Sequence, residues 1–207
     1  MMTAIADYGV GNLFSLKSSF DAIGEQAVVT SDPLVLRRAD HIVLPGVGAF
    51  GDAARKLKEG GLGEVIIEEA INGKPLIGIC LGMQLLFDKS LEYGEHEGLG
   101  LIRGTVIPIA DVIPAGLKIP HIGWNALRFT KKSALFKYIS EGDCVYFVHS
   151  YYAAYCDESV TSVAEYGAPI TASVESGSVF GCQFHPEKSG KIGLAILKAF
   201  TETERIK

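Results

Sequence analysis

PLIGICLGMQLLF, residues 75–87, combines an apolar run with a cysteine flanked by glycines, and the fold prediction rests on it first. The apolar run Pro75–Ile79 predicts a buried strand, and Leu81–Phe87 predicts a helix that begins directly after it. Cys80 lies at the junction, with one glycine two residues before it and another two residues after it. This G-x-C-x-G pattern is typical of a nucleophile elbow, a tight strand-to-helix turn that lifts one side chain above the sheet edge.

A helix N-terminus directed at Cys80 would favour the thiolate, because the helix dipole and the free N–H groups stabilise negative charge. A small buried cysteine in a glycine-rich core strand would show the same short pattern. The elbow is therefore a hypothesis, and it needs a base and an orienting group elsewhere in the chain.

The residues before this stretch alternate between strand-like and helix-like patterns. Short apolar runs predict three strands, at Thr3–Asp7, Gln26–Thr30 and His41–Leu44. Apolar residues at helical spacing predict three helices, at residues 13–23, 52–58 and 62–72. This order predicts an α/β fold with an open, mostly parallel, flavodoxin-like sheet that helices flank on both faces.

The second half of the chain is richer in short strands bounded by turns. The predicted strands are Leu101–Ile109, Asp143–Val148, Ser159–Glu165, Ile170–Glu175 and Val179–Phe184. We expect them as antiparallel additions to the first sheet or as a smaller sheet beside it. A last helix is predicted from Ser189, which we expect to act as its N-cap. Without a linker or an internal repeat, residues 1–207 are expected to form one domain.

The triplet His185-Pro186-Glu187 follows the last predicted strand. Ligands of open α/β sheets bind at the carboxyl ends of the strands, so His185 and Cys80 can face one crevice. In extended geometry Glu187 lies on the same side as His185 and could fix its imidazole. An H-x-E triplet alone is more often part of a solvated loop, but beside an elbow cysteine it predicts a Cys80–His185–Glu187 triad.

A glycine-rich loop, Pro45–Gly51, follows the strand predicted at His41–Leu44. Glycines let backbone amides approach a ligand closely, so this loop could stabilise an oxyanion, with a second N–H from Leu81. Phosphate binding is a rival use of such a loop, but the Lys-Ser/Thr ending of a P-loop is missing.

Composition excludes several classes of protein. The 207 residues are 48% hydrophobic and 21% charged, which fits a packed core rather than disorder. The net charge of −5 and the lack of a basic cluster argue against a nucleic-acid partner. We expect a soluble, cytoplasmic chain with no signal peptide, membrane span or metal site. Core packing is the default role for Cys144, Cys156 and Cys182.

Taken together, these motifs are similar to those of the class I, triad-type glutamine amidotransferases. The similarity covers essentially the whole chain and follows the order of the family's motifs. The loop from Pro45, the elbow around Cys80 and the His185 triplet match the class as a whole. Three further motifs, at residues 7–13, 120–125 and 146–152, match the glutaminases that serve a cyclase in histidine biosynthesis.

The resemblance implies that Cys80 attacks the side-chain amide of glutamine, with no cofactor. It also implies that the oxyanion rests on the backbone amides of Gly46, Val47 and Leu81. His185 would protonate the departing ammonia and then activate water, and Glu187 would hold His185 in the needed tautomer. The substrate contacts implied are the side chains of Gln84 and Glu92 and the backbone at His149, Ser150 and Tyr151. Gln84 lies one helical turn after Cys80 and so on the same face. An exposed helix residue at 84 and a surface charge at 92 are the simpler alternatives.

The resemblance also implies a partner, because a glutaminase alone would release its ammonia into solution. Such glutaminases form a heterodimer with a (β/α)8-barrel cyclase that makes imidazole glycerol phosphate and aminoimidazole carboxamide ribotide. The residues expected at the interface are Asn12, Trp124 and Lys188. A core position is the alternative for Trp124. We also hypothesise that the Pro45–Gly48 loop is misaligned until the partner binds its nucleotide.

Three other functions stay open at this point. The chain could be a glutaminase for another synthase, a cysteine peptidase of flavodoxin-like shape, or a glutaminase-like module without catalysis. A peptidase would leave Gln84 and Glu92 without a role. Retention of Cys80, His185 and Glu187 speaks against a silent module.

Overall fold

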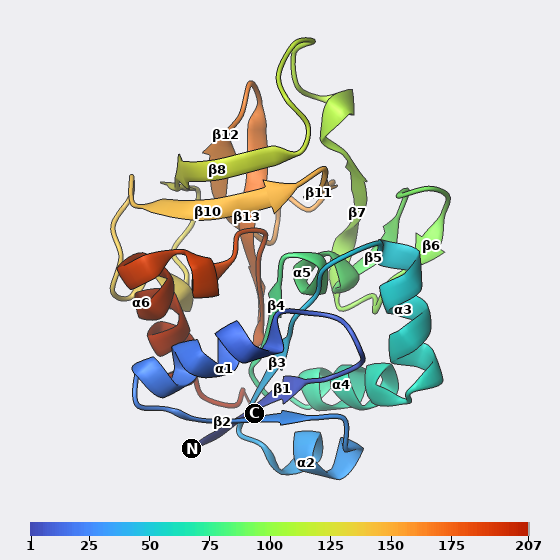
Figure 1. The fold of residues 1–207 in the computed structure, drawn as a ribbon, viewed down its shortest axis with the longest axis vertical. Helices are drawn as coiled ribbons and strands as arrows, with labels where there is room; N and C mark the ends of the chain where they lie inside the picture. Colours follow the sequence, from blue (N-terminus) through green and yellow to red (C-terminus); the bar gives the residue numbers. More distant parts are fainter. Residues whose placement is uncertain (207) are drawn as a thin grey trace.

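The largest sheet of the computed structural model, which describes residues 1–206, has eight strands. Their order is β2-β1-β3-β4-β14-β13-β12-β9 (Figure 1). The five parallel strands are β1 (Met2–Ala6), β2 (Gln26–Thr30), β3 (His41–Leu44), β4 (Leu76–Ile79) and β14 (Val179–Cys182). The antiparallel additions are β13 (Pro169–Ser176), β12 (Val160–Glu165) and β9 (Arg128–Phe129). The prediction of an α/β fold with antiparallel additions is confirmed.

One detail of the prediction was wrong, because β14 is not an antiparallel addition. It pairs in parallel with β4, with Gly181 opposite Gly78, and antiparallel with β13. The parallel sheet therefore continues one strand further than the order of motifs along the chain suggests. The consequence is that β4 and β14 end side by side at the same edge.

Side chains alternate across the central strands and build a core on each face of the sheet. Ile5, Val43 and Ile77 pack in the core beneath α1 (Leu13–Ala22) and α6 (Gly190–Thr201). Their neighbours in the strands pack in the other core, against α3 (Phe50–Glu59) and α4 (Leu62–Ile71). Figure 1 shows these helix pairs on opposite sides of the sheet, with α2 (Pro33–Arg38) at the β2 end.

Two smaller sheets lie beyond the edge where β4 and β14 end (Figure 1). In one, β10 (Cys144–His149) pairs antiparallel with β8 (His121–Ala126). The other has the order β11-β7-β5-β6. Its strands are β11 (Tyr151–Ala154), β7 (Ile102–Pro108), β5 (Phe87–Ser90) and β6 (His96–Glu97). Short 3-10 turns complete the elements, at Ile109–Asp111 (η1), Ala134–Phe136 (η2) and Pro186–Lys188 (η3).

The helix predicted over Leu81–Phe87 is shorter than expected. Helix α5 covers Leu81–Leu85, and the chain turns into β5 at Phe87. The carbonyl of Leu85 accepts the N–H of Leu99, and the carbonyl of Leu86 accepts the N–H of Leu101. These partners from a distant segment satisfy carbonyls that a longer helix would need to bond within itself.

Ser189 occupies the predicted N-cap position of α6, but its side chain does not cap the helix. Its Oγ donates to the carbonyl of His185 at 2.6 Å and accepts the N–H of Tyr146 at 2.9 Å. Ser189 thus joins the turn after β14 to β10. Sequence reasoning missed α2, although Asp32 caps its first turn through the N–H of Leu34 and Pro33 stands at its first position.

None of the helices among residues 1–206 is both long and apolar enough to cross a membrane. Within the same residues, the His, Cys, Asp and Glu side chains form no group of three or more suited to hold a metal ion.

Candidate active site

Cys80 occupies a strained turn between β4 and α5. Its φ of 54° and ψ of −110° lie outside the common regions for a residue with a Cβ. A Cβ on Gly78 would lie 2.6 Å from the carbonyl oxygen of Gly82, and one on Gly82 would lie 1.9 Å from that of Leu44. Both glycines are therefore required by close backbone packing. The N–H of Cys80 donates to the carbonyl of Cys182 at 2.8 Å, which ties the turn to β14.

His185 follows β14 and reaches the same edge of the sheet as Cys80. Its Nδ1 donates to Oε1 of Glu187 at 2.8 Å, so the proton sits on Nδ1 when the ring is neutral. Both side chains are almost completely buried. Burial lowers the pKa of His185, but hydrogen bonds and charges from Cys80 and Glu187 outweigh it and raise the pKa to about 9. Cys80 and Glu187 thus favour the protonated imidazole, and Glu187 also fixes its orientation.

The glycine-rich loop after β3 packs directly on the elbow. A Cβ on Gly46 would lie 2.7 Å from the N of Gly82 and 2.9 Å from the Cβ of Leu81, so the two backbones touch. The hydroxyl of Tyr8 donates to the carbonyl of Pro45 at 2.6 Å and anchors the loop from the segment after β1. Burial, with the neighbouring Cys80, raises the pKa of that hydroxyl, which keeps it protonated as a donor.

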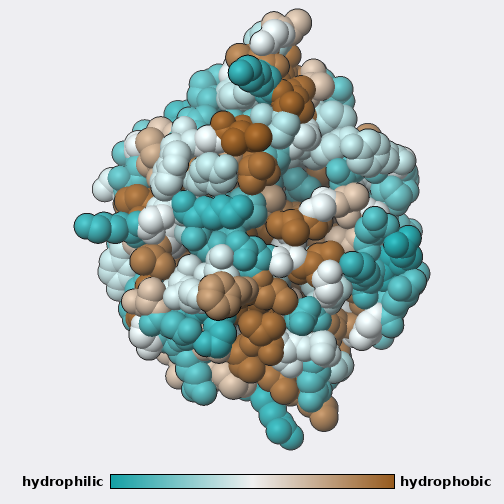
Figure 2. Space-filling view, in the orientation of Figure 1, coloured by the Kyte–Doolittle hydropathy of each residue, from teal (hydrophilic) through white to brown (hydrophobic). Residues whose placement is uncertain are grey.

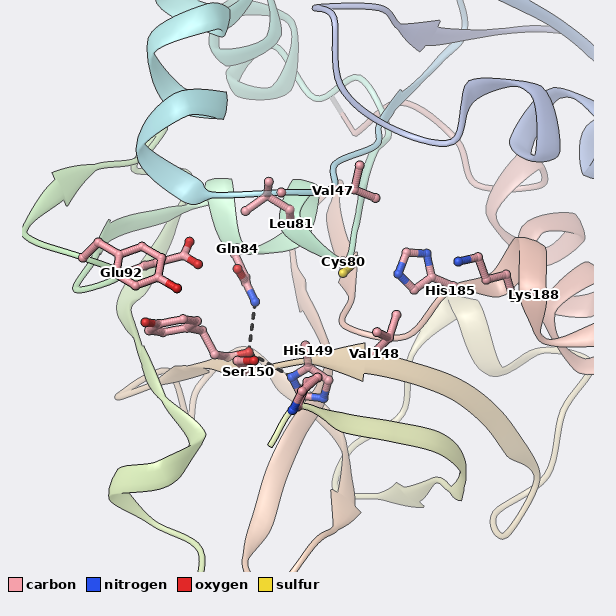
Figure 3. A pocket seen from close by; sticks show the side chains of 14 residues that line it. Val47, Cys80, Leu81, Gln84, Glu92, Val148, His149, Ser150, His185 and Lys188 are labelled. Atoms are coloured by element: carbon pink, nitrogen blue, oxygen red, sulfur yellow. Dashed lines mark hydrogen bonds between the residues drawn. The ribbon is translucent and has the colours of Figure 1, made fainter. Parts of the chain in front are cut away.

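These elements enclose a cavity of about 380 Å³ above the sheet edge (Figure 3). Figure 3 shows Cys80 near one end of the cavity, with His185 beside it and Val47 above it. Glu92 lies at the other end, and Gln84 lies between Cys80 and Glu92. The cavity brings together nine of the residues that sequence analysis singled out for catalysis or substrate, and His185 is the ninth beside Val47, Cys80, Leu81, Gln84, Glu92, His149, Ser150 and Tyr151. Lys188 also lines the cavity.

The sequence model for "Glutamine amidotransferase class-I" matches residues 4–202. The chain belongs to this family. The subunit HisH of imidazole glycerol phosphate synthase from Aquifex aeolicus is 50% identical over 97% of this chain and 96% of the relative. The HisH subunit from Sulfurimonas denitrificans is 48% identical over the whole of both chains. The family resemblance drawn from the motifs is confirmed.

Solved structures of this class share the fold. A crystal structure titled glutamine amidotransferase aligns with a TM-score of 0.74 at 18% identity, over 96% of this chain and 98% of that one. PurLQS from Thermotoga maritima aligns with a TM-score of 0.73 at 20% identity, over 97% of both chains. At this identity the likeness shows a shared arrangement of the elements.

Two predicted substrate residues already have partners within the amidotransferase chain. Oε2 of Glu92 accepts the N–H of Phe50 at 2.6 Å, where the carboxylate faces the positive N-terminus of α3. Nε2 of Gln84 donates to the carbonyl of Tyr151 and to Oε1 of Gln183, both at 3.0 Å. Neither residue is the solvated surface side chain that was the simpler alternative.

Gln183 is a site residue that sequence reasoning missed. It is fully buried, and its Nε2 donates to Sγ of Cys80 at 3.7 Å. The available signal was its position two residues before His185, because alternate residues of an extended segment point to the same side.

The three residues predicted at a partner interface differ in their surroundings. Asn12 caps α1 through the N–H of Ser15 at 3.4 Å. Trp124 is 58% exposed on β8, so the alternative of a core position is wrong for this side chain. Lys188 lies beside the cavity, with Nζ 5.9 Å from the ring centre of Tyr146.

Proposed function

We propose that this chain hydrolyses glutamine to glutamate and ammonia with a Cys80–His185–Glu187 triad and passes the ammonia to a cyclase subunit. The observation that carries the proposal is the pairing of Cys80 and His185 in one cavity, with Glu187 on the far nitrogen of the imidazole. Its relatives named as subunits of imidazole glycerol phosphate synthase support the choice of pathway. The whole chain would act as one cytoplasmic glutaminase domain.

In the first step, the Cys80 thiolate attacks the side-chain carbonyl carbon of glutamine and forms a C–S bond. Protonated His185 gives its proton to the departing nitrogen as the C–N bond breaks, and ammonia leaves. His185 then takes a proton from water, which attacks the thioester and breaks the C–S bond. Glu187 keeps the imidazole turned toward the sulfur and stabilises its charged form. Glutamate leaves, and the cysteine is restored.

Negative charge develops on the carbonyl oxygen in both steps. The backbone N–H groups proposed to receive it belong to Leu81, at the start of α5, and to Gly46 and Val47 in the adjacent loop. The close packing of the loop on the elbow supports this pairing. Loss of one such donor typically lowers the rate by about 10²–10³-fold. Movement of the loop on partner binding would then switch the glutaminase on.

Glutamine would lie along the cavity with its amide at Cys80 and its amino-acid end toward Glu92. The free oxygen of the Glu92 carboxylate suits the substrate ammonium, and the backbone at His149, Ser150 and Tyr151 would complete the pocket. Gln84 uses its nitrogen for internal hydrogen bonds, so its Oε1 is the atom proposed to contact the substrate.

The partner would dock over the mouth of the cavity, with Asn12, Trp124 and Lys188 in the interface. Figure 2 shows apolar side chains gathered over the middle of this face, from the region of β8 and β10 to that of α1. Ile122 and Phe14 are 57% and 82% exposed in these two regions. Such a patch suits a protein partner, and a (β/α)8-barrel cyclase in a heterodimer is the partner proposed.

The experiment is glutamate release from glutamine by this chain, mixed with a cyclase subunit and its nucleotide substrate. Cys80→Ala is the test variant, and Cys144→Ala, which alters an exposed cysteine away from the cavity, is the matched control. Release that needs the partner and Cys80, but not Cys144, supports the proposal. Release that persists in Cys80→Ala refutes the triad. Release only with the partner of another synthase refutes the pathway.

A further inference from the structure

A hydrogen-bond network leads from Sγ of Cys80 into the protein interior. Sγ of Cys80 accepts from Nε2 of Gln183 at 3.7 Å, and Oε1 of Gln183 accepts from Nε2 of Gln84 at 3.0 Å. The second N–H of Gln84 donates to the carbonyl of Tyr151, also at 3.0 Å. Figure 3 shows Gln84 directed at this carbonyl. Two side-chain amides thus stand in series behind the sulfur.

The hydrogen-bond network continues through two buried histidines to β8. The carbonyl of Tyr151 also accepts from Nδ1 of His149 at 2.9 Å, and His149 lies 3.1 Å from Nδ1 of His121 through its Nε2. Nε2 of His121 lies 3.4 Å from Nδ2 of Asn125, which also donates to the carbonyl of Glu165 at 2.8 Å. The far end is therefore anchored on the backbone of β12.

Only one assignment of protons satisfies every hydrogen bond in this network. A carbonyl cannot donate, so His149 carries its proton on Nδ1 and accepts at Nε2. His121 must then carry its proton on Nδ1, and Asn125 supplies the donor to its other nitrogen. Burial lowers the pKa of His121, and burial lowers the pKa of His149 to about 3, so both rings stay neutral near pH 7. Each amide and imidazole in the network therefore has one orientation and one tautomer.

The orientation matters most at Gln183, whose amide could otherwise turn over. With the observed orientation, its N–H faces the sulfur and stabilises a thiolate. A flipped amide would place an oxygen against the sulfur and repel the same charge. Gln84 prevents the flip, because it presents a donor to Oε1 of Gln183, and the carbonyl of Tyr151 fixes the orientation of Gln84 in turn.

We propose that Gln183 is a positioning residue for the Cys80 thiolate, that Gln84 holds it in that orientation, and that His149, oriented by His121, holds in place the Tyr151 carbonyl on which Gln84 is fixed. The inference rests on the proposed function for its catalytic meaning, but not for its test. If the hydrogen-bond network served packing alone, substitutions in it would lower stability and leave the reactivity of Cys80 unchanged.

The test is the rate of alkylation of Cys80 by iodoacetamide between pH 5 and 10, followed for each cysteine by peptide mass spectrometry. It uses the full chain without glutamine, so it does not depend on turnover. Cys144 is exposed and serves as an internal reference in every sample. His185, Tyr8 and Cys182 are the titratable groups that face Cys80, and all three are unchanged in the variants.

Gln183→Met keeps the approximate volume and removes the donor. We expect the midpoint of the Cys80 profile to rise by about one pH unit, as for a hydrogen bond to a charged group, while the Cys144 profile stays in place. Gln183→Glu, which puts an oxygen toward the sulfur, should raise it further. In the complex with its partner, Gln183→Met should lower kcat for glutamate release and leave KM nearly unchanged.

His121→Phe tests the remote end and provides a second variant if Gln183→Met does not fold. The ring of His121 stacks on Tyr166, with centroids 4.1 Å apart, so phenylalanine preserves the stack and removes the donor to His149. We expect a smaller rise of the Cys80 midpoint. Ser173→Ala is the matched control, because Ser173 is fully buried and lies outside the cavity lining. Its hydroxyl forms a hydrogen bond of 2.6 Å with that of Ser162.

Profiles of Cys80 that coincide with the wild type in folded Gln183→Met and His121→Phe would overturn the inference. A shift in Ser173→Ala as large as in these variants would also overturn it, because the effect would then be general destabilisation. If Cys80 shifts as expected but the wild-type complex releases no glutamate, the positioning holds and the proposed function fails. The two failures are therefore distinguishable.

Discussion

Alanine at position 82 should separate the two backbones that are proposed to form the oxyanion site. The added Cβ would lie 1.9 Å from the carbonyl oxygen of Leu44, whereas ordinary contact begins at 3.4 Å. The start of α5 must therefore move by about 1.5 Å from the end of β3. Leu44 directly precedes the Pro45–Gly48 loop, so the N–H groups of that loop and of Leu81 move apart.

The expected cost follows from this displacement. Misplacement by about 1 Å in an active site lowers the rate by about 10²-fold, and overpacking a core costs about 1–3 kcal/mol of unfolding free energy. Gly82→Ala should therefore reduce glutamate release, in the presence of partner and nucleotide, by at least about 10²-fold. Urea unfolding of the free chain measures the accompanying loss of stability.

Gly63→Ala is the matched control, because the nearest atom to a Cβ there is 3.5 Å away and the residue lies in the buried part of α4. Gly63 is the second residue of α4, and alanine has the higher helix propensity, by up to about 1 kcal/mol in a helix interior, so this variant should be as stable as the wild type or more so, with unchanged release. Wild-type release and an unchanged unfolding midpoint in Gly82→Ala would show that close contact between these two backbones is not required.

Three further changes have defined outcomes. Glu187→Gln should slow glutamate release by up to about 10⁴-fold through loss of the tautomer, and a rate near the wild type would exclude the orienting role. In the wild type, the pKa of His185 is about 9 in the folded chain and 6.5 in the unfolded chain. Protonation of His185 therefore stabilises the fold fully below pH 6.5, and this contribution disappears as pH rises through 9. The unfolding free energy measured in urea should fall less over this pH range in Glu187→Gln than in the wild type. Tyr8→Phe removes the anchor of Pro45, so glutamate release should fall by about 10-fold while the circular dichroism spectrum is unchanged; full release would show that the loop holds its position without this bond. Lys74→Met removes the buried ammonium that pairs with Glu69 and donates to the carbonyls of Leu36 and Arg37, and should cost about 1–3 kcal/mol in urea unfolding, since Glu69 keeps Arg37 as a partner; a wild-type midpoint would contradict a structural role for Lys74.

Local patterns in the sequence were enough to predict the α/β class and the elbow at Cys80. Strand and helix periods, and glycines beside a cysteine, are properties of neighbouring residues, and they retain their meaning wherever the segment lies in the fold. The pairing of His185 with Glu187 is also local, since the two residues are only two positions apart in an extended segment. For these reasons the sequence alone is sufficient to name the candidate triad.

Other features depend on segments that meet only in the folded chain. The parallel pairing of β14 with β4 brings His185 to Cys80, and backbone partners from residues 99–102 end α5 early. Glu92 reaches the start of α3 across 42 residues, and Gln183 reaches Cys80 across 103. A buried polar side chain takes whichever partner the packing presents, and no local period encodes that choice. Local patterns along the chain are enough to identify the groups that could react, whereas long-range packing sets which of them face one another and in which orientation.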